Sequence, residues 1–359
     1  MKKIVLTGGG TAGHVTPNIA LLPALQAAGY EIAYVGSYEG IEKKLIADFN
    51  IPYTGISTGK FRRYLDPKNF SDPFRVMKGF VEARNYLKNY QPDVVFSKGG
   101  FVSVPVVRAA ASLHIPCIIH ESDMTPGLAN KLCIPVAEKV CCNFPETMKN
   151  IPADKAVLTG SPIRAELAQG SRLAGLNMCG FTANKPVIMV IGGSLGAANV
   201  NKAVRDALSK LLEDFQVVHL CGKDKIDNLL LNTPGYKQFE YIKAELKDIF
   251  AMADVVISRA GANAICELLA LKKPNILIPL PAASSRGDQL LNAASFEAQG
   301  YSIVLNEDDI TTNLLVDKVH ELYFNRQNYV EAMSRSHQMD AINTIMLLIN
   351  EAANKSHTQ

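Results

Sequence analysis

Short apolar runs alternate along the chain with longer segments in which apolar residues recur every three or four positions. The short runs are rich in Val and Ile and predict strands at 3–7, 31–35, 93–97, 115–120, 139–142, 187–191, 216–220, 255–258, 275–278 and 302–305. The longer segments predict helices at 16–28, 199–212, 262–271 and 288–299, and one long amphipathic helix from 327 to 352. This alternation is typical of an α/β fold in which helices cover both faces of a parallel sheet.

The two halves of the chain resemble each other. Residues 3–10 and 187–194 both read as a strand that ends in a glycine turn, and residues 93–100 and 254–261 both begin with Asp-Val-Val. Two landmarks in the same order favour a repeated fold, so we expect two Rossmann-like, doubly wound domains. We place the N-terminal domain at 1–160 and the C-terminal domain at 161–330. A helix in 331–359 is expected to pack back on the N-terminal domain.

The composition narrows the class of protein. Hydrophobic residues make up 48% of the 359 residues and charged residues 20%, which is ordinary for a globular protein and excludes a disordered or fibrous chain. No apolar run reaches the roughly 18–20 residues of a membrane-spanning helix. The 7 cysteines form no CxxC pair and indicate reduced thiols in the cytoplasm. A net charge of +3 gives no reason to expect nucleic acid as a partner.

The first repeat is longer than the second between its two landmarks, and the excess falls in 60–88. Lysines and arginines outnumber acids there and alternate with bulky apolar residues. This combination is typical of a surface that rests on an anionic membrane, where each cation adds about 1 kcal/mol of attraction. A solvated helix with its aromatic rings turned inward is an equal alternative on composition alone. The candidates for membrane or acceptor contact are Lys60, Phe61, Arg62, Arg63, Phe74 and Arg75.

Two glycine-rich loops, at 8–13 and 192–196, each follow the strand that opens one half. Exposed backbone N–H groups at the start of a helix bind anions, and glycine lets a phosphate approach the backbone. The first loop matches GxGxxG, but no acid follows the second strand to hold a ribose, so NAD is disfavoured. We expect Thr16 to cap the helix after this loop, with Pro17 at its first position. Two such loops predict two phosphorylated partners.

Polar residues near these loops supply candidate chemistry, although a structural role is the alternative for each of them. His14 precedes a helix, whose dipole disfavours the imidazolium and leaves a neutral ring that accepts a proton. Arg164 and Arg259 can pair with phosphate, and Glu267 follows a strand end at a distance that suits ribose hydroxyls. No cluster of His, Cys and carboxylates suggests a metal, and no cofactor is expected.

Together these motifs make the chain resemble the MurG family, the peptidoglycan glycosyltransferases that add N-acetylglucosamine (GlcNAc) to lipid I. The matching segments follow in order along nearly the whole chain: 8–14, 97–103, 120–131, 160–164, 192–196, 259–262 and 288–289. The resemblance implies a GT-B fold, in which the two domains face a cleft, with UDP-GlcNAc on the C-terminal domain and the lipid acceptor on the N-terminal domain. It also implies inversion at the anomeric carbon, no catalytic metal, and a peripheral protein on the cytoplasmic face of the cell membrane.

The resemblance further implies the site residues. The expected catalytic residues are His14 as general base and Glu121, with Asp123 as another candidate base. The expected contacts to UDP-GlcNAc are Thr11, Ala12, Gly13, Asp123, Arg164, Ser194, the backbone of Ile242, Ala262, Asn263, Ala264, Ile265, Cys266, Glu267 and Gln289. Three positions depart from the family's pattern: Ala12 replaces a glycine, Asp123 an asparagine and Asp288 a glutamine. The first loop is expected to hold the acceptor's pyrophosphate.

Other activities remain compatible with the sequence. A UDP-GlcNAc 2-epimerase has a similar two-domain plan but needs no lipid acceptor, and a related glycosyltransferase would use another glycolipid. A dinucleotide-dependent oxidoreductase is a further alternative. The sequence leaves the oligomeric state and the peptide of the acceptor undetermined.

Overall fold

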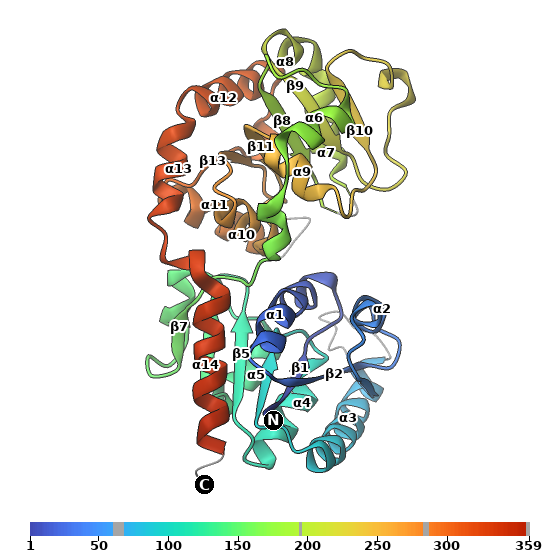
Figure 1. Ribbon diagram of the computed structural model, residues 1–359, viewed down its shortest axis with the longest axis vertical. Coiled ribbons are helices and arrows are strands. Elements are labelled where there is room, and N and C mark those ends of the chain that lie inside the picture. Colours follow the sequence, from blue (N-terminus) through green and yellow to red (C-terminus); the bar gives the residue numbers. More distant parts are fainter. Residues whose placement is uncertain (60–67, 194–195, 283–286, 357–359) are drawn as a thin grey trace. The chain divides into compact units, whose positions relative to one another are not determined.

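The computed structural model describes residues 1–59, 68–193, 196–282 and 287–356. Internal contacts divide the chain into two compact units, the first made of Met1–Arg164 and Asp340–Gln359 and the second of Ala165–Met339. The first break therefore falls at Arg164 rather than at the expected residue 160, and residues 331–339 are counted with the second unit. Each unit is built on one fully parallel sheet (Figure 1), as the alternating pattern predicted.

The first unit has a sheet of seven strands in the order β3-β2-β1-β4-β5-β6-β7. The strands are β1 Lys3–Thr7, β2 Glu31–Ser37, β3 Tyr53–Ile56, β4 Val94–Ser97, β5 Cys117–Glu121, β6 Lys139–Cys142 and β7 Ala156–Leu158. The main helices are α1 Thr16–Ala27, α2 Ile41–Ile46, α3 Lys68–Tyr90, α4 Ser103–Ser112, α5 Leu128–Cys133 and α14 Ala341–Ser356.

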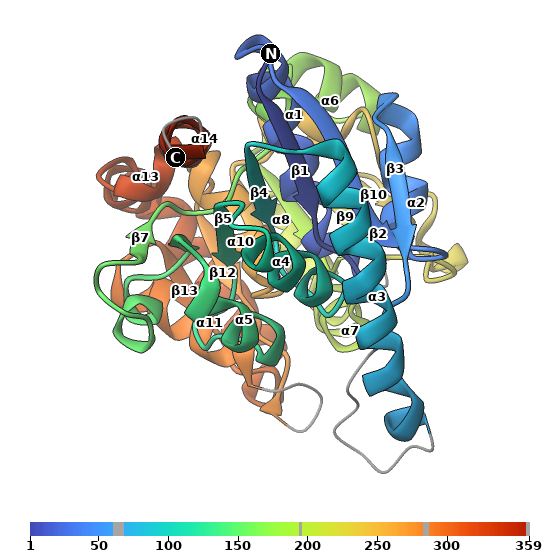
Figure 2. The same ribbon diagram turned by 90° about the horizontal axis from the view of Figure 1, so that it is seen from below.

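Both faces of the first sheet are covered, because successive side chains of a strand point to opposite sides. Ile4 and Leu6 of β1 pack in one core with residues of α1 and α14. Val5, between them, packs in a second core with residues of α3 and α4. Figure 2 shows α3 beside α4, and the C-terminal helix α14 contacts α1, β4 and β5.

The second unit has six strands in the order β10-β9-β8-β11-β12-β13. They are β8 Val187–Ile191, β9 Gln216–Leu220, β10 Tyr236–Phe239, β11 Val255–Ser258, β12 Asn275–Leu277 and β13 Ser302–Val304. The main helices are α6 Arg172–Cys179, α7 Ala198–Asp206, α8 Leu208–Asp214, α9 Leu246–Met252, α10 Ala262–Ala270, α11 Asp288–Ala298, α12 Thr312–Phe324 and α13 Arg326–Ser334.

The predicted repeat extends to individual hydrogen bonds. In both sheets the opening strand, β1 or β8, lies between the strand that follows it and the strand of the Asp-Val-Val motif, β4 or β11. The aspartates of the two motifs make equivalent hydrogen bonds. Asp93 accepts from the backbone N–H of Lys3 at 2.6 Å, and Asp254 accepts from the backbone N–H of Val187 at 2.8 Å. Each motif therefore fixes the start of the strand beside it.

Several predicted elements differ from the structure. The edge strands β3, β7 and β10 were not predicted, because they are three or four residues long and only partly buried. The helix expected over 327–352 is wrong as one element: α13 ends at Ser334, a 3-10 turn follows, and α14 begins at Ala341. The interruption coincides with the passage of the chain from the second unit to the first. The helix expected at 199–212 is likewise divided into α7 and α8.

The predicted helix cap at Thr16 is also wrong. A 3-10 turn, Ala12–His14, leads directly into α1, so Val15 is the N-cap and makes no side-chain cap bond. The Thr16 hydroxyl instead donates to the carbonyl oxygen of Ala12 at 3.0 Å. Across the described residues, no helix is both long enough and apolar enough to span a bilayer.

Candidate functional site

The two glycine loops lie at equivalent places in the two units. The first glycine loop, residues 8–14, follows β1, which pairs with β2 and β4. The second glycine loop, residues 192–196, follows β8, which pairs with β9 and β11. Both are points where the strand order reverses, and ligands of doubly wound sheets bind there, beyond the carboxyl ends of the strands.

The glycines that open the first glycine loop are packed against the protein itself. A Cβ at Gly8 would lie 2.6 Å from the carbonyl oxygen of His14, and one at Gly9 would lie 2.5 Å from the carboxyl carbon of Glu42. A Cβ at Gly10 would overlap the ring of Phe101. The absent side chains therefore leave room for protein atoms rather than for a phosphate. Sequence reasoning missed Glu42, which no motif marks.

His14 is held by its own turn. Its Nδ1 lies 2.9 Å from the hydroxyl oxygen of Thr11, and its side chain is partly exposed. In the tautomer whose Nδ1–H donates to this hydroxyl, Nε2 carries the lone pair and can accept a proton. Ala12 has a negative φ in the same turn, so alanine fits at this position without backbone strain.

A buried polar group lies at the carboxyl ends of β4 and β5. The ammonium of Lys98 lies 2.8 Å from Nδ1 of His120, and Nε2 of His120 lies 2.9 Å from the carbonyl oxygen of Gly160. Lys98 also donates to the hydroxyl of Ser122. Burial, with the charge of Lys98 adding to it, lowers the pKa of His120 well below its ordinary value. His120 is therefore neutral, donates to Gly160 and accepts from Lys98.

Glu121 holds the turn that follows β5. One carboxylate oxygen accepts from the backbone N–H of Asp123 at 3.0 Å, and the other accepts from the N–H of Gly127 at 3.1 Å and the amide of Asn130 at 2.8 Å. Burial raises the pKa of Glu121. Three internal donors favour a structural role over that of the base. Asp123 is partly exposed, and its carbonyl oxygen accepts from Thr147.

The glycines of the second unit differ from those of the first glycine loop. Gly193 (φ +83°), Gly261 and Gly287 (φ +81°) have no described atom within 4 Å of an added Cβ. Gly193 follows β8, Gly261 follows β11, and Gly287 precedes α11. In contrast, a Cβ at Gly192 would lie 2.6 Å from the backbone nitrogen of Ala197, and one at Gly196 would overlap the carbonyl oxygen of Cys221. Among the described residues, these three glycines therefore leave the backbone open to a ligand.

The other residues expected at the donor site fall into two groups. Ala262, Asn263, Ala264 and Glu267 lie on the first turns of α10 and are partly exposed, whereas the side chains of Ile265, Cys266 and Ile242 are buried. The last three can offer a ligand only their backbone.

Other expected residues lie on separate elements. Gln289, on α11, accepts a hydrogen bond from the backbone N–H of Leu280 at 3.1 Å. Asp288 is the first residue of α11, where the helix dipole favours an acid. Arg164 ends the first stretch of the first unit. Ser194 lies outside the described residues.

Arg259 has a partner other than the expected phosphate. Its guanidinium forms an ion pair with Glu307, and both side chains are almost fully buried. It also donates to the carbonyl oxygens of Ile278 at 3.0 Å and Pro279 at 3.3 Å. These contacts tie the end of β11 to the end of β12 and give the guanidinium partners within the protein, and the expected pairing of Arg259 with phosphate stays a prediction.

The basic segment of the first repeat forms the 23-residue helix α3 where the second repeat has the 7-residue α9. Lys60, Phe61, Arg62 and Arg63 lie outside the described residues. Phe74, Met77 and Val81 recur at helical spacing on α3 and are 78%, 63% and 52% exposed. Four cations are exposed on the same helix: Arg75, Lys78, Arg84 and Lys88. Phe74 and Arg75 are therefore on the surface, as the membrane hypothesis requires.

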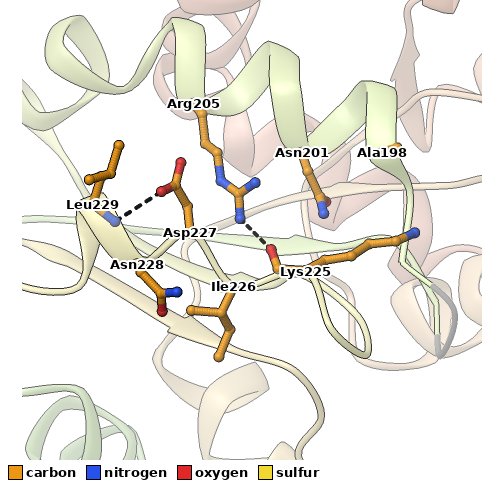
Figure 3. Close-up of a pocket in the computed structure, with 8 residues that line it drawn as sticks. All are labelled: Ala198, Asn201, Arg205, Lys225, Ile226, Asp227, Asn228 and Leu229. Atoms are coloured by element: carbon orange, nitrogen blue, oxygen red, sulfur yellow. Dashed lines mark hydrogen bonds between the residues drawn. The ribbon is translucent and has the colours of Figure 1, made fainter.

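A cavity of about 550 Å³ lies elsewhere in the second unit, between α7 and the segment after β9 (Figure 3). Its lining residues are Ala198, Asn201, Arg205, Lys225, Ile226, Asp227, Asn228 and Leu229. None of the expected site residues lines it. Arg205 donates to the carbonyl oxygen of Lys225 at 2.7 Å and so closes one side of the cavity. In the described part of the chain, no three His, Cys, Asp or Glu side chains come together as a metal site would require.

Comparisons with known proteins agree with the motifs. Residues 4–142 match the glycosyltransferase family 28 N-terminal domain, and residues 187–346 match the C-terminal domain of that family. A protein of Lachnospira eligens is 64% identical over 351 residues, which cover 98% of this chain and 99% of that protein. Its name is UDP-N-acetylglucosamine--N-acetylmuramyl-(pentapeptide) pyrophosphoryl-undecaprenol N-acetylglucosamine transferase. A protein of the same name from Clostridium botulinum is 56% identical with the same coverage.

Solved structures also show a similarity to MurG proteins. The crystal structure of Acinetobacter baumannii MurG aligns with a TM-score of 0.77 and 29% identity, covering 98% of this chain and 100% of that one. A putative UDP-N-acetylglucosamine 2-epimerase from Listeria monocytogenes aligns with a TM-score of 0.71 but only 13% identity, over 100% of this chain and 97% of that one, and so shares the fold alone. The resemblance to the MurG family is confirmed. With both of its domains matched, the chain belongs to glycosyltransferase family 28.

Proposed function

We propose that this chain transfers GlcNAc from UDP-GlcNAc to the C4 hydroxyl of N-acetylmuramic acid in lipid I. The products are UDP and lipid II, with a β-1,4 linkage, and the step belongs to peptidoglycan synthesis. The observation that carries the proposal is the match at 64% identity over 98% of the chain to a transferase named for this reaction. In this proposal the donor binds to the second unit and the acceptor to the first.

The donor binds to the second unit in this proposal. No described atom lies within 4 Å of a Cβ added at Gly193, Gly261 or Gly287, at strand and helix ends of this unit, which supports a nucleotide lying against the backbone there. Glu267 is proposed to bind the ribose and Gln289 the GlcNAc. Arg164, Ser194 and the amides of the second glycine loop would stabilise the charge that develops on the leaving diphosphate.

His14 is the proposed general base. Its Nε2 removes the proton of the C4 hydroxyl while the C4 oxygen forms a bond to the anomeric carbon and the bond from that carbon to the diphosphate breaks. One displacement inverts the anomeric configuration. The Thr11 hydroxyl would accept from Nδ1–H in the tautomer that leaves Nε2 free to take the proton, and Glu121 shapes the turn that carries Asp123. Residues 11–13, of which Thr11 and Ala12 are exposed and Gly13 is half-buried, remain the proposed contact for the acceptor's pyrophosphate.

The first unit is also the proposed membrane-facing part. The exposed apolar residues of α3, flanked by the cations Arg75, Lys78, Arg84 and Lys88, suit the surface of an anionic bilayer. A peripheral position at the cytoplasmic face would bring the enzyme to a lipid-linked acceptor.

The decisive experiment supplies a lipid I analogue and UDP-GlcNAc labelled in the sugar. A labelled lipid-linked disaccharide is expected, and its absence would refute the proposal. A parallel incubation with UDP-GlcNAc alone separates the alternative, because release of N-acetylmannosamine would indicate a 2-epimerase. Addition of NAD(P)H with no change in its fluorescence is the expected result for an enzyme without a dinucleotide cofactor.

A further inference from the structure

A fully buried carboxylate, that of Glu42, lies inside the first glycine loop. One of its oxygens accepts a hydrogen bond from the backbone N–H of Gly10 at 3.1 Å. The other accepts from the backbone N–H of Ser37 at 3.0 Å and from the hydroxyl of the same residue. The residue lies on the first turn of α2, and its exposed surface is 0%.

The surrounding sequence leaves a space of the size of this side chain. A Cβ at Gly9 would lie 2.5 Å from the carboxyl carbon of Glu42, and a Cβ at Gly36 would lie 2.8 Å from its Cγ. A Cβ at Gly40 would overlap one of the carboxylate oxygens. These glycines come from three different segments: the first glycine loop, β2, and the turn before α2. Any side chain at one of them would displace the carboxylate.

The carboxylate of Glu42 needs hydrogen-bond donors, because its burial removes it from water. An isolated buried carboxylate costs several kcal/mol unless donors compensate for lost water. Among the described residues, no cation forms an ion pair with Glu42, so the two amides and the hydroxyl are its compensation. Hydrogen bonds of this charge-assisted kind are about twice as strong as neutral ones.

The rest of the loop is held in a related way. The hydroxyl of Tyr34 donates to the carbonyl oxygen of Gly8 at 2.7 Å, and the amide of Asn18 donates to that of Thr7 at 3.1 Å. Of these three backbone contacts, the two at Thr7 and Gly8 use carbonyl oxygens, and only the one at Gly10 uses an N–H group. Glu42 accepts that hydrogen bond. The 3-10 turn that carries His14 starts two residues later.

We infer that Glu42 is a positioning residue: its carboxylate is an internal anion that occupies the amide of Gly10 and sets the backbone from which His14 projects. The phosphate of a ligand is thereby excluded from this amide, and the anion contact proposed for the first glycine loop is left to residues 11–13. The inference rests on the proposed function, because it acts through His14 on the acceptor side of the transfer.

The test compares Glu42→Gln with the wild type in the lipid I assay. Glutamine has the same shape but no charge, and its NH₂ group cannot accept from Gly10 or Ser37. We expect kcat to fall at least tenfold while KM for UDP-GlcNAc and the affinity for UDP stay within twofold. Hydrogen exchange should become faster in peptides covering 8–14 and 36–42 and remain unchanged in the other strands of the first unit.

Glu39→Gln is the matched control, because it makes the same change three residues away on an exposed side chain. It should leave all of these values at the wild-type level. A wild-type kcat in Glu42→Gln would overturn the inference. It would also be overturned if KM for UDP-GlcNAc changed by as large a factor as kcat. If Glu42→Gln does not fold, Ser37→Ala removes one donor and keeps the charge, and a wild-type kcat in this variant would refute the inference. A wild type that transfers no GlcNAc would instead refute the proposed function.

Discussion

Gly261 offers a direct test of the donor site, because alanine at this position alters the space in front of α10 and little else. Gly261 is the N-cap of α10 with φ of −67°, an ordinary value for any residue. No described atom lies within 4 Å of an added Cβ. Within the described part of the chain, Gly261→Ala therefore introduces neither backbone strain nor a clash.

The expected effects on stability and on binding differ in size. Glycine is a better N-cap than alanine by about 0.5–1 kcal/mol, which in a unit of this size lowers the unfolding midpoint by at most about 4 °C. A nucleotide oxygen held against the first amides of α10 would be displaced by the new methyl group. The loss of one hydrogen bond to a charged group is about 1.5–3 kcal/mol, which corresponds to a roughly 10- to 150-fold weaker affinity for UDP.

Titration calorimetry with UDP and thermal unfolding measure the two effects separately. Gly127→Ala is the matched control, since Gly127 is the N-cap of α5 in the first unit with φ of −66° and equally open space. It should leave the affinity for UDP unchanged. The reasoning is refuted if Gly261→Ala binds UDP within twofold of the wild type, or if both variants weaken binding alike.

Three further predictions concern the base, the membrane surface and the pH dependence. His14→Ala should lower kcat about 100-fold, because the proton acceptor is lost, while calorimetry finds the affinity for UDP unchanged; unchanged turnover would remove His14 from this role. Phe74→Ser with Arg75→Gln should weaken binding to anionic vesicles several-fold in a sedimentation assay, whereas Phe324→Ser, on an equally exposed ring of the second unit, should not. Burial lowers the pKa of His219 to about 3, so the ring stays neutral in the folded unit. In the unfolded chain the ring takes up a proton below about pH 6.5, so the free energy of unfolding falls as the pH is lowered from about 6.5 towards 3. The free energy of unfolding, measured with urea, should fall less between pH 7 and pH 5 for His219→Gln than for the wild type. Equal falls in the two proteins would contradict this assignment.

Local patterns in the sequence were sufficient for the repeated α/β plan. Strands such as β1, β8, β9 and β11 were predicted with the bounds that the structure has, because each contains a run of β-branched apolar residues and is buried on both faces. The Asp-Val-Val motifs were recognised as a repeat, and their aspartates do make equivalent hydrogen bonds. The family was indicated by motifs whose residues are close together in sequence. The edge strands β3, β7 and β10 escaped prediction, since they are short and only partly buried and their apolar signal is weak.

Tertiary structure decided how each side chain of these motifs is used. The glycines of the two loops look alike in sequence, but in the first loop Glu42 and Phe101 fill the space beside them, whereas no described atom lies within 4 Å of a Cβ added at Gly193. Arg259 was expected to pair with phosphate, and the fold brings the carboxylate of Glu307 against its guanidinium. Such partners lie tens of residues apart, and only the packing of helices on the sheets brings them together. Charge and spacing along the chain therefore identify candidate ligands, while burial and hydrogen bonding between distant segments determine which of them a substrate can reach.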